Sequence, residues 1–344
     1  MRWLVPLYLL TICSPMFGQT PETSFQIKLQ DSGVNASFRG LAVRNRKEAW
    51  ATGTQGTVVR TTNGGETWTR IRLPDSDALD FRDIALLPNR TVLIMSVGDG
   101  KASRILRSTD NGESWQVVLL NSDPTGFFDG MAFDSQGQRG VLFGDPVDGR
   151  LSIFRTADGG ESWVALPTKQ RPRLADGEYG FAASGSSVRF QDDNIWIATG
   201  GSVARVFRST DGGEEWSVAK TPLRSGNESS GIFSLAALSS QSLVIIGGDY
   251  KQPEKDKSNV SRSMDGGRTW EQLNSVRMPH KACVQFLGDG RLLTCGRTGV
   301  ALSYDAGKSW REISAESFYV FGFDSESGTG FLAGAEGRIA RFDL

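Results

Sequence analysis

The sequence predicts an all-β fold, a seven-bladed β-propeller closed into a ring. An eight-residue pattern that ends in Trp occurs six times, at intervals of about 40 to 55 residues, a period typical of repeat architectures. Each interval holds short runs rich in β-branched residues between turns that contain Gly and Asp. Glycine makes up 41 of the 344 residues, which favours tight turns over long helices.

The N-terminal segment has the features of a secretory signal. Arg2 is followed by an apolar run over residues 4–12, which is too short to span a bilayer because a spanning helix needs about 20 residues. We therefore expect a cleaved signal peptide over residues 1–18, an extracytoplasmic location (periplasmic or secreted), and a single propeller domain over 19–344. Leu10-Thr-Ile-Cys13 resembles a lipoprotein box with a bulky Ile before the Cys, so lipidation at Cys13 stays open.

The six boxes predict β-hairpin turns. The Asp or Asn at the third position can accept backbone N–H groups within the turn, and the first hydroxyl can add a further bond. The Gly two residues later takes a backbone angle that other residues resist, and the Trp begins the next strand with its ring between neighbouring sheets. We expect a structural role for the box acids, amide and tryptophans: Asn63, Trp68, Asp110, Trp115, Asp158, Trp163, Asp211, Trp216, Asp265, Trp270, Asp305 and Trp310.

Each repeat contains four strand-like segments, as a propeller blade requires. The second repeat has them at 81–86, 91–96, 104–107 and 115–119. After the sixth box only three follow, at 318–323, 329–333 and 338–342. Residues 25–29 precede the first blade and have no other partner, so we expect this strand to complete the last blade and leave no open edge in the ring.

Three segments and the boxes carry a family resemblance. The boxes are Asp-box (BNR) repeats, and residues 25–344 resemble the photosystem II assembly and stability factor family with its uncharacterised bacterial relatives. The segments are Phe81-Arg-Asp-Ile84, Gly144-Asp-Pro-Val-Asp-Gly149 and Phe181-Ala-Ala-Ser-Gly185. The resemblance implies a seven-bladed, exported, non-catalytic assembly platform that binds a protein partner such as a membrane complex.

Composition excludes several other functions. Lys and Arg total 38 against 39 Asp and Glu, and no basic run of five or more occurs, so we expect no nucleic-acid partner. One His and three Cys lack metal-ligand spacing, so we expect no metal and no cofactor. The absence of a G-x-G-x-x-G motif argues against a redox enzyme. We expect a monomer.

The alternative to a protein-binding platform is a glycoside hydrolase, sialidase-like or related, that acts on an extracytoplasmic glycan. Such an enzyme needs two carboxyl groups, or a Tyr nucleophile with a Glu, and Glu178-Tyr179 could supply parts of this machinery. Because no arginine triad can be assigned, the sequence favours a non-catalytic protein and leaves catalysis open.

The binding surface is expected on the face opposite the boxes. The box turns join the third and fourth strands on one face, so the variable connectors between blades must emerge on the other face. We expect polar residues at the starts of first strands, including Arg39 and Lys281, to ring the channel mouth there. The predicted binding residues are Arg82, Asp83, Asp129, Asp145, Arg173, Glu178 and Tyr179.

Three further features have structural interpretations. If residues 288–290 form a hairpin turn, Cys283 and Cys295 are cross-strand neighbours, and a disulfide or two buried thiols both remain open. His280 is expected on a solvated surface connector. An Arg precedes five of the boxes, and this recurrence favours a role in blade packing. These residues are Arg60, Arg107, Arg155, Arg208 and Arg262.

Overall fold

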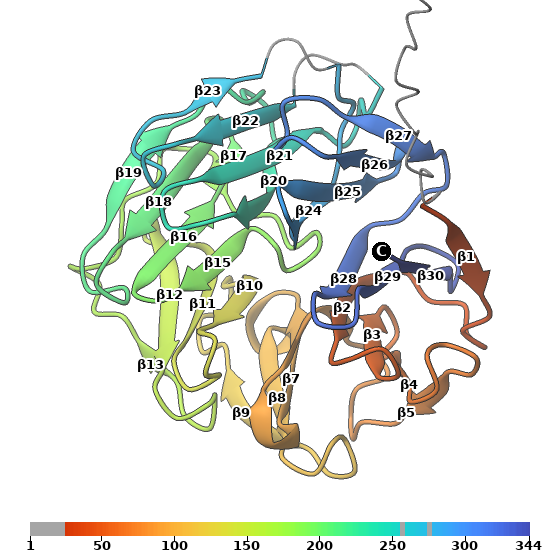
Figure 1. The fold of residues 1–344 in the computed structure, drawn as a ribbon. Helices are drawn as coiled ribbons and strands as arrows, with labels where there is room; N and C mark the ends of the chain where they lie inside the picture. The colour runs from red at the N-terminus through yellow and green to blue at the C-terminus, as the bar shows by residue number, and fades with distance from the viewer. Residues whose placement is uncertain (1–24, 255–258, 274–276) are drawn as a thin grey trace, which may run out of the picture.

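The computed structural model describes residues 25–254, 259–273 and 277–344. Seven antiparallel sheets surround a central axis (Figure 1), which confirms the predicted seven-bladed β-propeller. The expected signal peptide and Cys13 lie outside the described residues. In the described part, the helical elements are the short 3-10 helices η1 (Pro88–Arg90) and η2 (Gly100–Ala102), and no helix is long and apolar enough to cross a membrane.

The strands of the first four blades run in order from the axis outward. Blade 1 holds β2 (Phe38–Val43), β3 (Ala49–Gly53), β4 (Val58–Thr61) and β5 (Thr69–Ile71). Blade 2 holds β6 (Asp80–Leu86), β7 (Val92–Val97), β8 (Arg104–Ser108) and β9 (Gln116–Leu120). Blade 3 holds β10 (Phe128–Phe133), β11 (Gly140–Val147), β12 (Arg150–Thr156) and β13 (Val164–Ala165). Blade 4 holds β15 (Val188–Gln191), β16 (Asn194–Ala198), β18 (Arg205–Ser209) and β19 (Ser217–Lys220).

The remaining blades follow the same plan. Blade 5 holds β20 (Ser230–Ala237), β21 (Leu243–Asp249), β22 (Val260–Ser263) and β23 (Glu271–Gln272), extended by β14 (Glu178–Tyr179) and β17 (Gly200–Gly201). Blade 6 holds β24 (Cys283–Gly288), β25 (Arg291–Gly296), β26 (Gly299–Ser303) and β27 (Arg311–Ser314). Blade 7 holds β28 (Val320–Asp324), β29 (Thr329–Ala333) and β30 (Ile339–Asp343), with β1 (Ile27–Gln30) as its outermost strand.

Blade 7 contains strands from both ends of the described chain. β1 pairs antiparallel with β30, so that Ile27 lies opposite Phe342 and Gln30 opposite Ile339. The strand begins two residues later than the sequence predicts. Because β1 is the outermost strand of the last blade, this pairing holds the two ends of the propeller together.

The hydrophobic core is divided into layers between neighbouring blades. Phe143 of β11 and Ile195 of β16 share one such layer between blades 3 and 4. Trp50 of β3 and Phe81 of β6 share another between blades 1 and 2, and both are fully buried. The box tryptophans lie at the edges of these layers and are only half-buried, because their positions adjoin the exposed turns.

The box turns have the hydrogen bonds that their residue types predict. In the third box the Thr156 hydroxyl donates to the Asp158 carboxylate at 2.7 Å and accepts the Gly160 N–H at 2.9 Å. Asp158 also accepts the Ser162 N–H at 3.0 Å and the Ser162 hydroxyl at 2.5 Å. In the first box Asn63 accepts the corresponding N–H of Thr67 at 3.0 Å, so an amide can replace the acid.

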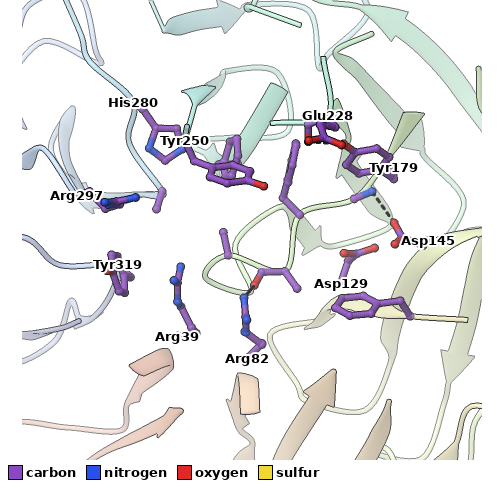
Figure 2. A pocket seen from close by; sticks show the side chains of 17 residues that line it. Arg39, Arg82, Asp129, Asp145, Tyr179, Glu228, Tyr250, His280, Arg297 and Tyr319 are labelled. Carbon is purple, nitrogen blue, oxygen red and sulfur yellow. Dashed lines mark hydrogen bonds between the residues drawn. The ribbon is translucent and has the colours of Figure 1, made fainter. Parts of the chain in front are cut away.

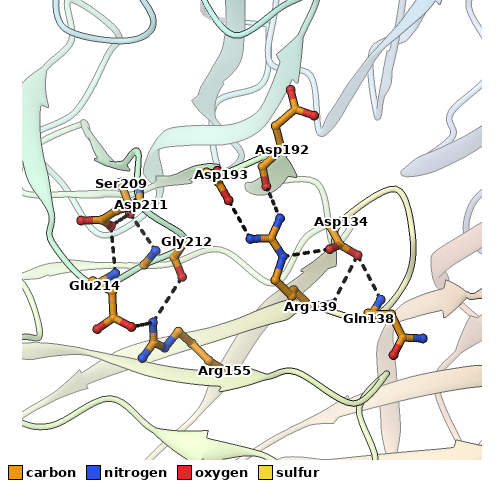
Figure 3. A network of polar contacts seen from close by, with 11 residues as sticks. Asp134, Gln138, Arg139, Arg155, Asp192, Asp193, Ser209, Asp211, Gly212 and Glu214 are labelled. Carbon is orange, nitrogen blue, oxygen red and sulfur yellow. Dashed lines mark hydrogen bonds and ion pairs between the residues drawn. The ribbon is translucent and has the colours of Figure 1, made fainter.

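Two of the five recurring arginines connect a box to the preceding blade. Arg107 donates to the Gly159 carbonyl in the next blade's box at 3.1 Å, and Arg155 donates to the Gly212 carbonyl at 3.4 Å. Figure 3 shows the second contact beside Arg139, which bridges Asp134 and Asp193 between blades 3 and 4. These contacts agree with the expected role in blade packing.

Candidate functional site

A cavity of about 560 Å³ lies at the axial mouth of the propeller. Its lining comes from the starts of inner strands, the ends of second strands and the connectors between blades. Because strands alternate in direction, these positions lie at the opposite ends of the blades from the box turns, which follow third strands. The lining residues are Arg39, Arg82, Phe127, Asp129, Asp145, Tyr179, Gly180, Phe181, Ala182, Ala183, Glu228, Phe233, Tyr250, His280, Ala282, Arg297 and Tyr319.

β-Bulges mark the inner strands that contribute to this cavity. In four blades the pairing of the inner strand with its neighbour skips one residue near the strand start. A bulge places an extra residue on one strand and re-aims its side chain. The four skipped residues, Arg39, Arg82, Asp129 and Phe233, all line the cavity. The local irregularity of the sheets therefore supplies cavity side chains.

One side of the cavity is basic. Figure 2 shows Arg39, Arg297 and Tyr319 side by side, with Arg82 next to them. The Arg39 guanidinium stacks over the Tyr319 ring at 3.9 Å from its centroid, while Arg82 pairs with Asp80 at 2.6 Å and donates to the Ala182 carbonyl at 3.0 Å. Burial and the neighbouring Arg82 charge lower the pKa of Arg39 to about 10. An anionic group would relieve this repulsion.

The other side is acidic. Asp129 and Asp145 lie together beside Tyr179 in Figure 2, and Asp145 accepts the Gly180 N–H at 3.1 Å. Burial and the adjacent Asp145 charge hold the pKa of Asp129 well above its ordinary range. Burial raises the pKa of Asp145 to about 6, although the Gly180 N–H opposes this shift. The pair therefore tends to retain a proton in mildly acidic solution.

Aromatic rings form the wall between these two sides. Phe181 stacks on Phe233 with centroids 4.1 Å apart, and Tyr179 meets Phe181 edge to face at 5.6 Å. The Tyr179 hydroxyl donates to the Glu228 carbonyl. Burial and the charge of Glu228 raise the pKa of Tyr179 to about 12, so this residue stays a neutral phenol.

His280 belongs to this aromatic wall, so its predicted place on a solvated connector is wrong. The side chain is buried, 3% exposed, with its ring 4.5 Å from that of Phe233 in an edge-to-face contact. Burial lowers the pKa of His280 to about 4. The ring is therefore neutral at physiological pH.

Four of the seven predicted binding residues line the cavity together: Arg82, Asp129, Asp145 and Tyr179. Asp83 lies buried behind it and accepts the N–H groups of Ile84 and Met131 at 2.8 and 2.9 Å, while burial raises its pKa to about 7. Glu178 is buried in an ion pair with Arg205.

Two further polar residues also lie away from the cavity surface. Arg173 is exposed and is not among the residues that line the cavity. Lys281, expected at the mouth, is buried and donates to the carbonyls of Thr298 and Gly299 at 2.8 and 2.9 Å. These backbone acceptors replace solvent around the ammonium group.

Sequence reasoning missed Phe233, Tyr250, Arg297 and Tyr319 as lining residues. One available signal was position, because Arg39, Arg82, Asp129 and Tyr319 each follow a Phe that is fully buried at an inner strand's start. Those phenylalanines are Phe38, Phe81, Phe128 and Phe318. The register of the repeat, rather than residue type, identifies these cavity positions.

The cysteines lie outside the cavity. Cys283 and Cys295 are direct cross-strand partners on β24 and β25, as the hairpin register predicts, and both are buried free thiols in the structure. Within the described residues, no three metal-ligating side chains come together.

Seven antiparallel blades around an axial cavity lined by charged residues define the chain as a seven-bladed β-propeller. The chain belongs to the family described as the DUF6242 beta propeller domain, whose family model matches residues 19–235. It is similar to the photosystem II assembly protein Ycf48 of Synechococcus sp. (strain JA-2-3B'a(2-13)), at 26% identity over 71% of this chain and 65% of that protein. The match thus spans a little under two thirds of that relative's length.

Two other similarities concern a solved structure and an enzyme. The structure titled "YCF48 bound to D1 peptide" matches with a TM-score of 0.63 and 17% identity, over 94% of this chain and 96% of that one, and shares the fold. Xyloglucanase Xgh74A of Acetivibrio thermocellus is 26% identical over 63% of this chain, but over only 29% of the enzyme.

Proposed function

We propose that this chain is an exported, non-catalytic assembly platform that binds a protein partner by taking a segment of that partner into the axial cavity. The partner is a membrane complex in this proposal, because the similar Ycf48 protein of Synechococcus is named for photosystem II assembly and a solved structure of similar fold is titled "YCF48 bound to D1 peptide". Export rests on the signal features of residues 1–18.

The observation that carries the proposal is the pair of oppositely charged walls in one cavity. A volume of about 560 Å³ lies in the usual range for ligand sites and can hold a few residues of a peptide. Arg39 and Arg297 supply positive charge on one side, and Asp129 and Asp145 supply carboxyl groups on the other. Such walls match a polypeptide segment with charged side chains better than an apolar small molecule.

Affinity capture from envelopes of the native host tests this function. The bait is the propeller over residues 19–344, and captured proteins are identified by mass spectrometry. The cavity variant Arg39→Gln/Arg297→Gln is compared with Arg268→Gln/Lys308→Gln, which removes the same charge from two box turns. We expect membrane-complex subunits with the wild type and the box variant, and at least tenfold less with the cavity variant. Equal capture by both variants would refute the proposal.

Glycan hydrolysis is the second candidate, favoured by the buried Asp129 and Asp145 carboxyls in the cavity and by the similarity to a xyloglucanase. A glycosidase requires an acid and a base or nucleophile of this kind. Reducing-sugar release from xyloglucan and from fluorogenic glycosides distinguishes the two functions. Hydrolysis by the wild type that Asp145→Asn abolishes would favour the enzyme.

A further inference from the structure

We propose that Asp129 and Asp145, with the ring of Tyr179 beside them, form a subsite for a basic side chain of the bound partner, a guanidinium or ammonium group. This inference rests on the proposed function and adds what the partner segment must carry. The three residues come from β10, β11 and β14, the last of which lies in the segment between blades 3 and 4. We name this group the cation subsite.

The strongest support is the environment of Asp129. Its side chain is only 1% exposed, and its Oδ2 atom has no hydrogen-bond donor among the described residues. A buried carboxylate without a counter-charge costs several kcal/mol, so such groups are normally paired or protonated. Gly180 packs against this oxygen so tightly that a Cβ there would lie 2.3 Å from it. The chain therefore holds the Asp129 carboxyl in place beside Asp145, and no ion pair with a cation of the described residues neutralises it.

Two of the three arginines that line the cavity have partners within the chain, and the third, Arg297, lies on the basic side near Arg39 and Tyr319. Arg82 pairs with Asp80 at 2.6 Å, and Arg39 stacks on Tyr319. Lys251 pairs with Glu228, the remaining acid of the lining. The Asp145 carboxyl accepts the Gly180 N–H and shares a hydrogen bond with the Asp129 side chain, and neither partner is a cation. A cation from outside the chain is therefore the group that best matches the two carboxyls.

The aromatic wall also favours a basic side chain in the cation subsite. A guanidinium or ammonium group is attracted to the face of an aromatic ring within about 6 Å of its centroid. Tyr179 lies beside Asp145 in Figure 2 and is anchored by its hydroxyl on the Glu228 carbonyl. Its T-shaped contact with Phe181 fixes the ring further. Carboxylates next to a fixed ring are a common arrangement for basic side chains.

The basic side of the cavity, which holds Arg39 and Arg297, determines a second charge that the partner segment must carry. An isolated cation would meet repulsion from Arg39 and Arg297, whereas a segment with an acidic group at a short distance from a basic one satisfies both walls. We infer that the partner segment carries both charges.

Small probes test the cation subsite without knowledge of the partner. Butylguanidinium and butylammonium mimic basic side chains, and butanamide is the neutral control. Each is titrated into isotope-labelled protein of residues 19–344 at pH 7, with the Gly180 amide resonance as the local reporter. We expect the two cations to bind with millimolar Kd and shift this resonance, whereas butanamide leaves it in place. No shift with either cation would overturn the proposal.

Matched variants locate the binding. Asp145→Asn preserves shape and removes charge, and we expect it to weaken both cations at least tenfold. Asp176→Asn changes an exposed acid in the segment that carries Tyr179, and it should leave the Kd of both cations unchanged. Asp129→Asn is the second test if Asp145→Asn unfolds, as checked by thermal melting. Equal cation binding by Asp145→Asn and wild type would also overturn the proposal.

Partner capture separates this inference from the proposed function. If the function is right and the cation subsite wrong, Asp145→Asn captures the partner as wild type does, while Arg39→Gln/Arg297→Gln does not. If the function is wrong, butylguanidinium still shifts the Gly180 amide, but neither variant changes capture.

Discussion

The guanidinium of Arg341 donates a hydrogen bond to the backbone carbonyl of Gly64 at 3.0 Å, although 277 positions separate the two residues in the chain. Arg341 lies on β30 of blade 7, and Gly64 lies in the first box, after β4 of blade 1. Arg107 and Arg155 make the same kind of contact between internal blades. One type of interaction therefore connects neighbouring blades, including the pair at the junction of the two chain ends.

Replacing Arg341 with Ala should loosen this junction. The change removes the bond to Gly64 and the ion pair with Asp343 at 2.8 Å, and we expect a loss of about 1–2 kcal/mol in the free energy of unfolding. Amide hydrogen exchange should quicken along β1, because β30 is its pairing partner. The control Arg107→Ala removes an internal contact and should leave β1 protected. Equal exchange of β1 in the two variants would contradict this role of Arg341.

Removing a box acid should destabilise one turn without changing the cavity. We expect Asp158→Ala to cost about 1–3 kcal/mol in urea unfolding, because the N–H and hydroxyl groups of Ser162 lose their acceptor. Asp158→Asn should cost less, since Asn63 already occupies this position in the first box. Hydrogen bonds from Ser162 and Thr156 overcome the effect of partial burial and lower the pKa of Asp158 to about 2.

The lowered pKa of Asp158 determines how its contribution to the free energy of unfolding changes with pH. The stabilising contribution of Asp158 is present above the ordinary carboxyl pKa near 4 and is lost as pH falls toward 2. The variant Asp158→Ala should therefore differ from wild type at pH 7 and converge on it only as pH falls to about 2. A difference that stays constant with pH would contradict this assignment.

The architecture was predictable because the same local turn sequence recurs along the chain. Six boxes with a hydroxyl, an acid or amide, a Gly and a Trp each specify a turn that needs no distant partner. The cavity was only partly predictable, since its positions share a register and differ in residue type from blade to blade. Arg82 and Asp129 suggested a polar site, whereas Phe233 in the corresponding position of blade 5 carries no polar group that would indicate one.

The wrong predictions concern residues that a segment distant in the sequence buries in the folded protein. Asp83 follows Arg82 in the sequence, yet the connector between blades 3 and 4 covers it so closely that a Cβ on Gly185 would lie 2.1 Å from its Oδ1. His280 follows Pro279 in a segment typical of surface loops, but Phe233 and the aromatic wall enclose it. Local sequence does not report which distant segment will lie on top.

Neutralising Asp145 should stabilise the fold at high pH. Burial raises its pKa from 3.8 to about 6, so the cost of its charge begins as pH rises past the unfolded pKa of 3.8, grows between these two values and is complete above 6. We expect Asp145→Asn to raise the free energy of unfolding by roughly 1–3 kcal/mol at pH 8 and by far less at pH 4.5. Urea titrations at both values measure this, with Asp176→Asn as control. A pH-independent effect of Asp145→Asn would show that burial does not shift this carboxyl.

The two cysteines should be free thiols that the folded structure protects from thiol reagents. Cys283 and Cys295 face each other across the β24–β25 hairpin, and both are fully buried. We expect a thiol reagent to modify neither in folded protein of residues 19–344 and both in concentrated urea without reductant. Cys283 also accepts weak hydrogen bonds from Ser186 and Gln285, so Cys283→Val should cost about 1 kcal/mol more than Cys295→Val. No reactive thiol in urea would instead reveal a disulfide.

His280 should titrate far below an ordinary histidine. It is the only histidine of the chain, so its ring protons give one resolved NMR titration curve. Burial against Phe233 lowers its pKa to about 4, and the neutral ring contributes stability that is lost as pH falls from 6.5 through 4. We expect a midpoint near 4 in wild type. Phe233→Ala should open the wall and move the midpoint upward, while Phe323→Ala, in the core of blade 7, should not. A wild-type midpoint near 6.5 would contradict the enclosed position of this ring.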